Sequence, residues 1–228
     1  MDKVDNTAKR SLFEQSRPVI GLFAKQPVPG QVKTRLTPPL KPDQACRLYQ
    51  TALQETLAIL CSSGVPVTLC YAGEHRWFRQ NFPGQTLLAQ VGEDLGTRMT
   101  RAVEELFAVG FGPVLLAGSD SPDLPASRVV DVLAHLAETD VVTVPSDDGG
   151  YAVIGLRRPT TAVFATIPWS TAGVQDAIRL RCRQLGLSYA ETASWYDLDD
   201  MEDLRRLVTR SPASRTARQI ASELSALL

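Results

Sequence analysis

The segment AKQPVPGQVKTRL combines cations and a glycine in a pattern that suits phosphate binding. It contains Ala24, Lys25, Gly30, Lys33 and Arg35. Lys and Arg donate charge-assisted hydrogen bonds to phosphate oxygens, and a glycine lets the backbone approach a ligand closely. We therefore predict that these five residues bind the phosphates of a nucleotide. The alternative is a solvated basic loop, because the segment has neither the GxxxxGK[ST] nor the GxGxxG pattern.

Two acidic segments follow much later in the chain. GSDSPDLP contains Asp120, and WYDLDDMEDL contains Asp199. Magnesium prefers carboxylate oxygens together with substrate phosphates, so we predict that Asp120 and Asp199 hold one divalent ion. Lys25, Lys33 and Arg35 are expected to hold the phosphates opposite that ion. Lys33 and Arg35 are also expected to stabilise the charge that develops during transfer.

A third polar segment, PSDDGGYAVIGL, places two aspartates before two glycines. We predict that Asp148 or Asp147 orients a sugar or an acceptor, and that Gly149 and Gly150 let the backbone pass close to the nucleotide. The alternative is a hairpin turn, which needs the same residue types.

Other aspartates of these segments have structural explanations. Asp123 could shape a turn or cap the next helix, and Asp200 could cap the helix that begins near Met201. Asp197 precedes that helix and has no such explanation.

The elements that must position these segments alternate between strands and helices. Apolar runs predict strands at residues 19–24, 65–71, 86–88, 113–117, 141–144 and 151–156. Apolar residues at helical spacing predict helices at residues 42–60, 95–107, 129–136, 174–185, 201–208 and 216–227. This alternation is typical of an α/β protein with a mostly parallel sheet covered on both faces. Such sheets bind ligands beyond the carboxyl ends of their strands, where the polar segments fall.

The composition excludes several classes of function. The chain has 228 residues with a formal net charge of -1, which gives no reason to expect nucleic acid or a membrane surface as the partner. It has no apolar run of about 20 residues. The four cysteines form no CxxC pair, so we expect a cytoplasmic protein. Residues 1–17 are expected to be a flexible extension, and residues 18–228 a single nucleotide-binding transferase domain.

The motifs FAKQPVPGQVKTRL, GSDSPDLP, DDGGYAVIGL, PWST and DLDDMEDL together resemble the DUF2064 family of glycosyltransferase-A-like (GT-A-like) proteins, which includes arsenosugar biosynthesis glycosyltransferases. They are more distantly similar to phospholactate and molybdenum cofactor guanylyltransferases. The resemblance implies a three-layer α/β/α Rossmann-like GT-A fold. It also implies a donor that depends on Mg²⁺ or Mn²⁺, held by Asp120 and Asp199. The chain departs from the DxD motif of sugar transferases, because Asp120 is followed by Ser121, Pro122 and Asp123.

Three functions are compatible with these residues. The family resemblance favours a glycosyltransferase that uses a nucleotide-sugar donor and a small-molecule acceptor, and this is the function we expect first. The dense cations favour a nucleotidyltransferase, which joins a nucleoside monophosphate to a phosphorylated acceptor and releases pyrophosphate. The third is a nucleotide-binding protein without catalysis. The oligomeric state stays open, and a homodimer is one option.

Overall fold

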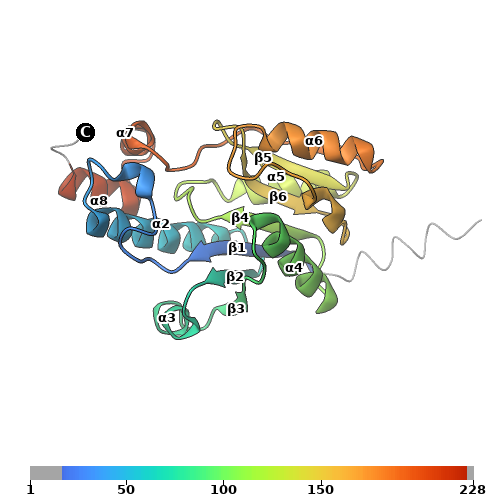
Figure 1. Cartoon of the computed structure of the whole chain (residues 1–228), viewed down its shortest axis with the longest axis horizontal. Coiled ribbons are helices and arrows are strands. Elements are labelled where there is room, and N and C mark those ends of the chain that lie inside the picture. The colour runs from blue at the N-terminus through green and yellow to red at the C-terminus, as the bar shows by residue number, and fades with distance from the viewer. Residues whose placement is uncertain (1–16, 225–228) are drawn as a thin grey trace, which may run out of the picture.

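The computed structural model describes residues 17–224, and within them the chain forms one seven-stranded sheet with strand order β3-β2-β1-β4-β6-β5-β7 (Figure 1). The strands are β1 (Val19–Lys25), β2 (Val67–Ala72), β3 (Thr86–Ala89), β4 (Val114–Gly118), β5 (Val141–Pro145), β6 (Tyr151–Leu156) and β7 (Tyr189–Glu191). The six strands expected from the sequence are all present. The three-residue edge strand β7 was not predicted, because so short a run carries no recognisable alternation.

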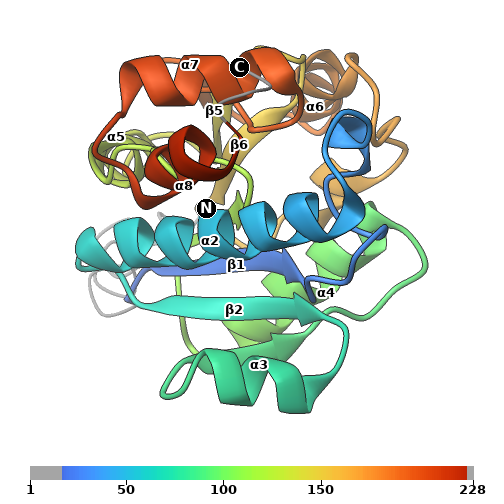
Figure 2. The ribbon, with the colours of Figure 1, turned by 90° about the vertical axis from the view of Figure 1, so that its left-hand side faces the viewer.

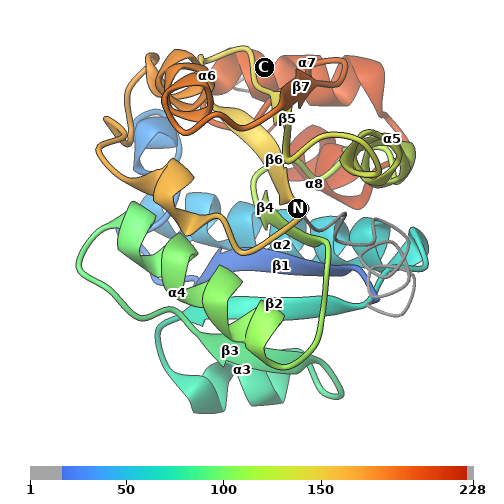
Figure 3. The same cartoon turned by 90° about the vertical axis from the view of Figure 1, so that its right-hand side faces the viewer.

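Helices cover both faces of this sheet. They are α2 (Pro42–Ser62), α3 (His75–Asn81), α4 (Leu95–Ala108), α5 (Ser127–Leu136), α6 (Val174–Gln184), α7 (Met201–Arg210) and α8 (Arg215–Glu223), with short 3₁₀ turns at Thr34–Leu36 and Thr161–Phe164. Figure 2 shows α2 running along β1 on one side of the sheet, and Figure 3, from the opposite side, shows α4 in front of the strands. The predicted three-layer α/β/α arrangement is therefore confirmed.

Two apolar layers hold the helices to the sheet. On one face Leu22 and Leu115 pack with Leu53 of α2. On the other face Val103 of α4 and Ile178 of α6 pack against the neighbouring strand positions. Successive residues of a strand point to opposite faces, so each buried strand supplies both layers, which explains its nearly continuous apolar sequence.

The sheet is parallel except at β6. Strand β1 pairs in parallel with β2 and β4, whereas β6 runs antiparallel to both β4 and β5. The turn from Ser146 to Gly150 therefore closes a β5–β6 hairpin, with the Ser146 amide donating to the Gly150 carbonyl at 3.0 Å. The hairpin interpretation of this segment is thus correct. The turn also lies at the carboxyl end of β5, on the same edge of the sheet as the loops after β1 and β4.

The helix α8 docks on α2, and α7 packs on α8 (Figure 2). Leu48 of α2 is buried with Leu204 of α7 and Ile220 of α8. Glu55 of α2 also caps α8, because its carboxylate accepts hydrogen bonds from the Arg215 and Thr216 amides at 2.7 and 2.9 Å. This docking fixes the start of α7, which carries the late acidic segment.

Three expectations concern properties other than topology. Cys46, Cys70 and Cys182 are buried free thiols, and Cys61 is an exposed free thiol. The described helices include none with the length and apolarity that crossing a membrane would require. The extension expected at residues 1–17 lies, except for its last residue, outside the described residues.

Replacing Glu55 with alanine is expected to lower the free energy of unfolding by about 2 kcal/mol, because the first turn of α8 loses the acceptor for its amide groups. Urea unfolding followed by circular dichroism measures the change. The exposed helical Glu104→Ala is the matched control and should change stability little. Equal effects of the two substitutions would show that Glu55 does not anchor α8.

Candidate active site

A cavity of about 840 Å³ opens at the carboxyl ends of β1 and β4. Its wall includes residues from all four polar segments and from the loop before α4. The charged residues that line it are Lys25, Lys33, Glu93, Arg35, Arg98, Asp120, Asp148, Asp197 and Asp199. Cations and carboxylates far apart in sequence therefore share one cavity.

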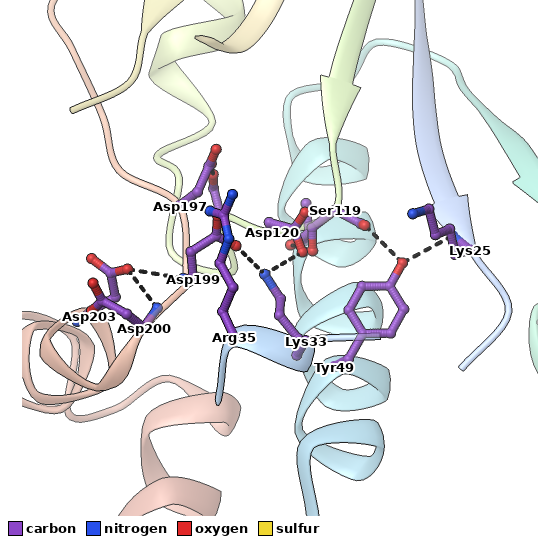
Figure 4. Close-up of polar contacts among 12 residues, drawn as sticks. Lys25, Lys33, Arg35, Tyr49, Ser119, Asp120, Asp197, Asp199, Asp200 and Asp203 are labelled. Carbon is purple, nitrogen blue, oxygen red and sulfur yellow. Dashed lines mark hydrogen bonds and ion pairs between the residues drawn. The ribbon is translucent and has the colours of Figure 1, made fainter. Parts of the chain in front are cut away.

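The Lys33 ammonium lies between the two predicted metal ligands (Figure 4). Its Nζ is 2.6 Å from Asp120 Oδ1 and 3.1 Å from Asp199 Oδ1. Arg35 approaches the other oxygen of Asp199, with Nη1 at 2.8 Å from Oδ2. The structure thus brings Asp120 and Asp199 together, as expected, but the cation between them is the Lys33 ammonium, and the metal-binding role of the two aspartates stays a prediction.

The expectation that Lys33 and Arg35 lie opposite the carboxylates is wrong for this structure, because both cations contact them directly. The side chain of Lys33 is 5% exposed, whereas that of Arg35 is 67% exposed. Burial alone would lower the pKa of Lys33, but the adjacent Asp120 and Asp199 carboxylates outweigh it and raise the pKa above its ordinary value. Lys33 is therefore a permanent positive charge in the cavity wall.

A backbone hydrogen bond holds the two acidic segments together. The Leu198 amide donates to the Asp120 carbonyl at 2.8 Å. Asp200 then caps α7 by accepting from the Glu202 and Asp203 amides at 2.8 and 3.0 Å, which confirms its predicted role. Asp199 is consequently fixed between a strand-end contact and a helix cap.

Asp123 anchors the same segment from its other side. Its carboxylate accepts hydrogen bonds from Tyr196 Oη at 2.8 Å, from Ser211 Oγ at 2.7 Å and from Trp195 Nε1 at 3.3 Å. The structural interpretation of Asp123 is supported, although it does not cap the next helix: the residue before α5 is Ala126, which makes no side-chain cap.

Tyr49 of α2 joins the carboxyl ends of β1 and β4 beneath the cavity (Figure 4). Its hydroxyl accepts a hydrogen bond from the Lys25 amide at 3.0 Å and shares another with Ser119 Oγ at 2.9 Å. Burial, together with the nearby Asp120 carboxylate, raises the pKa of Tyr49 to about 12, so the hydroxyl stays neutral. The sequence pattern places Tyr49 on the apolar face of α2. Its role at the cavity could have been found only from the rule that a buried tyrosine hydroxyl needs a hydrogen-bond partner.

Asp197 is a carboxyl group of altered acidity beside the two predicted ligands. Its Oδ1 accepts a hydrogen bond from Ser121 Oγ at 2.6 Å. Burial and the charge of Asp120 raise its pKa to about 7. Near neutral pH the group can therefore either donate or accept a proton.

The β5–β6 hairpin supplies Asp148 and Gly150 to the wall. Asp148 accepts hydrogen bonds from Ser146 Oγ and, at 2.9 Å, from the Gly150 amide. Asp147 turns away and pairs with Arg206 at 2.6 Å. Of the two aspartates, Asp148 is the one placed to meet a ligand.

Two predicted glycines do not line the cavity. Gly30 lies in an exposed turn with φ of 77°, where it allows the loop to reverse. Gly149 has φ of 86° and packs on the Ala172 backbone, where an added Cβ would lie 2.1 Å from the carbonyl oxygen. Both glycines permit a backbone turn with positive φ, and neither lines the cavity. Ala24 and Lys25 do line it, and their phosphate-binding role stays a prediction.

Two carboxylates that face one ammonium have the donor chemistry for a hard divalent ion. Among the described residues no group of three or more acidic, histidine or cysteine side chains could hold a metal. Magnesium is commonly held by one or two carboxylates plus substrate phosphates. Asp120 and Asp199 therefore fit an ion that arrives with a nucleotide, and fit poorly a tightly held resident ion.

A family model described as "Uncharacterized protein conserved in bacteria (DUF2064)" matches residues 56–171. The chain belongs to this family. A solved structure from Desulfovibrio desulfuricans G20, a candidate nucleotide-diphospho-sugar transferase, is 32% identical, with a TM-score of 0.86 over 92% of this chain and 96% of that one. A 2-phospho-L-lactate guanylyltransferase from Methanocella arvoryzae is 28% identical over 128 residues, which are 56% of this chain and about half (53%) of that relative.

Two more distant structures share the fold with the DUF2064 chain. The synthetase of CMP-2-keto-3-deoxy-manno-octonic acid in complex with CTP is 14% identical, with a TM-score of 0.54 over 87% of this chain and 99% of that one. A Mycobacterium tuberculosis H37Rv protein, Rv0371c, in complex with manganese is 16% identical, with a TM-score of 0.55 over 85% of this chain and 98% of that one.

Replacing Gly149 with alanine is expected to lower the free energy of unfolding by about 2 kcal/mol or more, because the methyl group meets the Ala172 backbone and the positive φ strains it. Gly150→Ala is the matched control: its Cβ would meet only side chains, Asp148 Oδ1 at 3.2 Å and Ser146 Oγ at 3.7 Å. Urea unfolding of both variants tests this. The idea fails if the two variants are equally stable.

Asp197 predicts a pH effect in the metal-free protein. Its pKa is about 7 in the folded chain against an ordinary value of 3.8, so between these values the folded state binds more protons than the unfolded state. This group's contribution to the free energy of unfolding therefore falls as pH rises through that window. Asp197→Asn stays neutral and should gain stability over the wild type between about pH 5 and about pH 8. Urea unfolding in EDTA measures the difference; a gap that does not change with pH would refute it.

Proposed function

We propose that the chain is a transferase that binds a nucleotide-linked donor with a divalent metal, Mg²⁺ or Mn²⁺. The observation that carries the proposal is the convergence of Asp120 and Asp199 on one positive charge in a cavity that Lys25 and Arg35 also line. The name of the Desulfovibrio relative and the manganese complex of the mycobacterial protein support it.

Nucleotidyl transfer is the reaction that this site favours. An oxygen of a phosphorylated acceptor would attack the α-phosphorus of a nucleoside triphosphate, and the bond from that phosphorus to the bridging oxygen would break, so that pyrophosphate leaves with the electron pair. An ionised phosphate needs no base, so the site must chiefly position groups and offset negative charge. Four cations line the cavity, Lys25, Lys33, Arg35 and Arg98, and the Methanocella relative is named a guanylyltransferase.

Each group has a defined task in this reaction. Asp120 and Asp199 would hold the metal, which supplies positive charge to the donor phosphates. Lys25, Lys33 and Arg35 would bind the leaving pyrophosphate portion through charge-assisted hydrogen bonds. Tyr49, which holds the Lys25 amide and Ser119, would keep the two strand ends in register beneath the donor.

Glycosyl transfer is the second candidate. The name of the Desulfovibrio relative favours it, and a hydroxyl acceptor would need a base. Asp148 lines the cavity, and Asp197 has a pKa of about 7, so the site contains carboxylates that could accept that proton.

The product separates the two reactions. The protein is incubated with Mg²⁺, nucleoside triphosphates and 2-phospho-L-lactate or hexose 1-phosphates, and separately with nucleotide sugars and sugar or polyol acceptors. We expect pyrophosphate in the first set. Nucleoside diphosphate formed only in the second set would establish glycosyl transfer. Isothermal titration with the same nucleotides supplies a readout that needs no acceptor: failure of every nucleotide to bind with Mg²⁺ would overturn the transferase proposal.

Asp120→Asn and Asp199→Asn are each expected to lower the metal-dependent rate by about 100-fold or more, because each removes a ligand charge at the transferred group. Asp176→Asn is the matched control, since Asp176 lies on α6 with its side chain 82% exposed. Thermal melts of all three establish folding. Full activity of either site variant would exclude that aspartate from the metal site.

A further inference from the structure

Lys33 occupies the position between Asp120 and Asp199 that a metal ion would need. Its Nζ lies within 3.1 Å of an oxygen of each carboxylate. Magnesium binds oxygen at about 2.0–2.1 Å, and both oxygens of Asp199 are already in ion pairs, Oδ1 with Lys33 and Oδ2 with Arg35. The ammonium and the ion cannot both be there, so Lys33 must leave before both aspartates can bind a metal.

The local charges also oppose the entry of a metal alone. Asp120 and Asp199 carry two negative charges, and Lys33 and Arg35, which contact them, carry two positive charges. A free divalent ion therefore meets a neutralised pair of ligands and would release a buried ammonium without a new partner. Burying a charge without a partner is strongly unfavourable. A nucleotide polyphosphate that arrives with the ion supplies that partner.

The loop that carries Lys33 is built in a way that permits the movement. It joins β1 to α2 and contains only the short 3₁₀ turn Thr34–Leu36 as regular structure. Lys33 itself has φ of 48° and ψ of 41°, a left-handed conformation that is unfavourable for a residue with a Cβ. Its contacts with the aspartates offset that strain. The lysine stem has four flexible carbons, so the ammonium can turn toward the cavity that the residue already lines.

We infer that Lys33 is an exchangeable internal cation, which holds Asp120 and Asp199 together in the nucleotide-free protein and transfers to the donor phosphates when the metal takes its place. Metal and nucleotide consequently bind with positive coupling, and the metal binds weakly alone. The inference rests on the proposed function, because it needs the same metal and the same donor.

Mn²⁺ binding without nucleotide tests the exchange directly. The free Mn²⁺ signal in electron paramagnetic resonance gives the dissociation constant of each purified protein. Lys33→Met removes the competing charge and should bind Mn²⁺ at least tenfold more tightly than the wild type. Lys33→Asn is the second variant, because asparagine tolerates left-handed backbone and so protects the test against misfolding.

Lys25→Met is the matched control. It removes one positive charge from the same cavity wall, but Lys25 has no ion pair with a carboxylate among the described residues. Its Mn²⁺ affinity should rise much less than that of the Lys33 variants. An equal rise in the control would mean that net charge alone sets the affinity, and would overturn the exchange.

Nucleotide binding supplies the second arm of the experiment. Isothermal titration of GTP and CTP with and without Mg²⁺ should show metal-dependent tightening in the wild type that is reduced at least tenfold in Lys33→Met. Equal Mn²⁺ affinity of the wild type and both Lys33 variants would overturn the exchange while leaving the transferase proposal intact. If no protein binds Mn²⁺ even with nucleotide present, the metal role is wrong both in the proposed function and in the exchange.

Discussion

One hydrogen bond, from the Leu198 amide to the Asp120 carbonyl at 2.8 Å, brings the two halves of the site into one place. It joins the loop after β4 to the segment before α7, which are far apart in sequence. The hydrogen bond from Ser121 Oγ to Asp197 at 2.6 Å links the same two segments a second time. The packing of α7 on α8 and of α8 on α2 keeps the segment before α7 in place, so the packing of the C-terminal helices has a direct electrostatic consequence at the cavity.

The second constraint on the site is charge compensation. Carboxylates that must receive a metal repel one another until it arrives, and a cavity that must receive phosphates collects cations that would otherwise be poorly solvated. Here each set neutralises the other through Lys33 and Arg35. Asp197 accommodates the remaining negative charge by its raised pKa, and Tyr49 by remaining neutral. The same charged residues thus stabilise the ligand-free protein and remain available to an ionic ligand.

The fold was predictable from the sequence because strands buried on both faces and amphipathic helices leave strong periodic signals. The location of the site followed from the rule that ligands bind beyond the carboxyl ends of the strands. Individual contacts were not predictable in this way. A basic loop does not reveal whether Lys33 meets a phosphate or Asp120, and Gly30 in an exposed turn has the same sequence appearance as a glycine at a ligand. Tyr49 was missed because its ring fits an apolar helix face while its hydroxyl serves the cavity floor.

The close seat of Gly149 on the Ala172 backbone has a consequence for the wall of the cavity. The hairpin tip and the stretch leading into α6 are further joined by a hydrogen bond from the Gln175 amide to the Gly149 carbonyl at 2.9 Å. These contacts join the hairpin to the segment before α6 and restrain that wall of the cavity. The segment between β1 and α2, which also lines the cavity, has only one short 3₁₀ turn and is held to the core by the buried Val32 and Leu36.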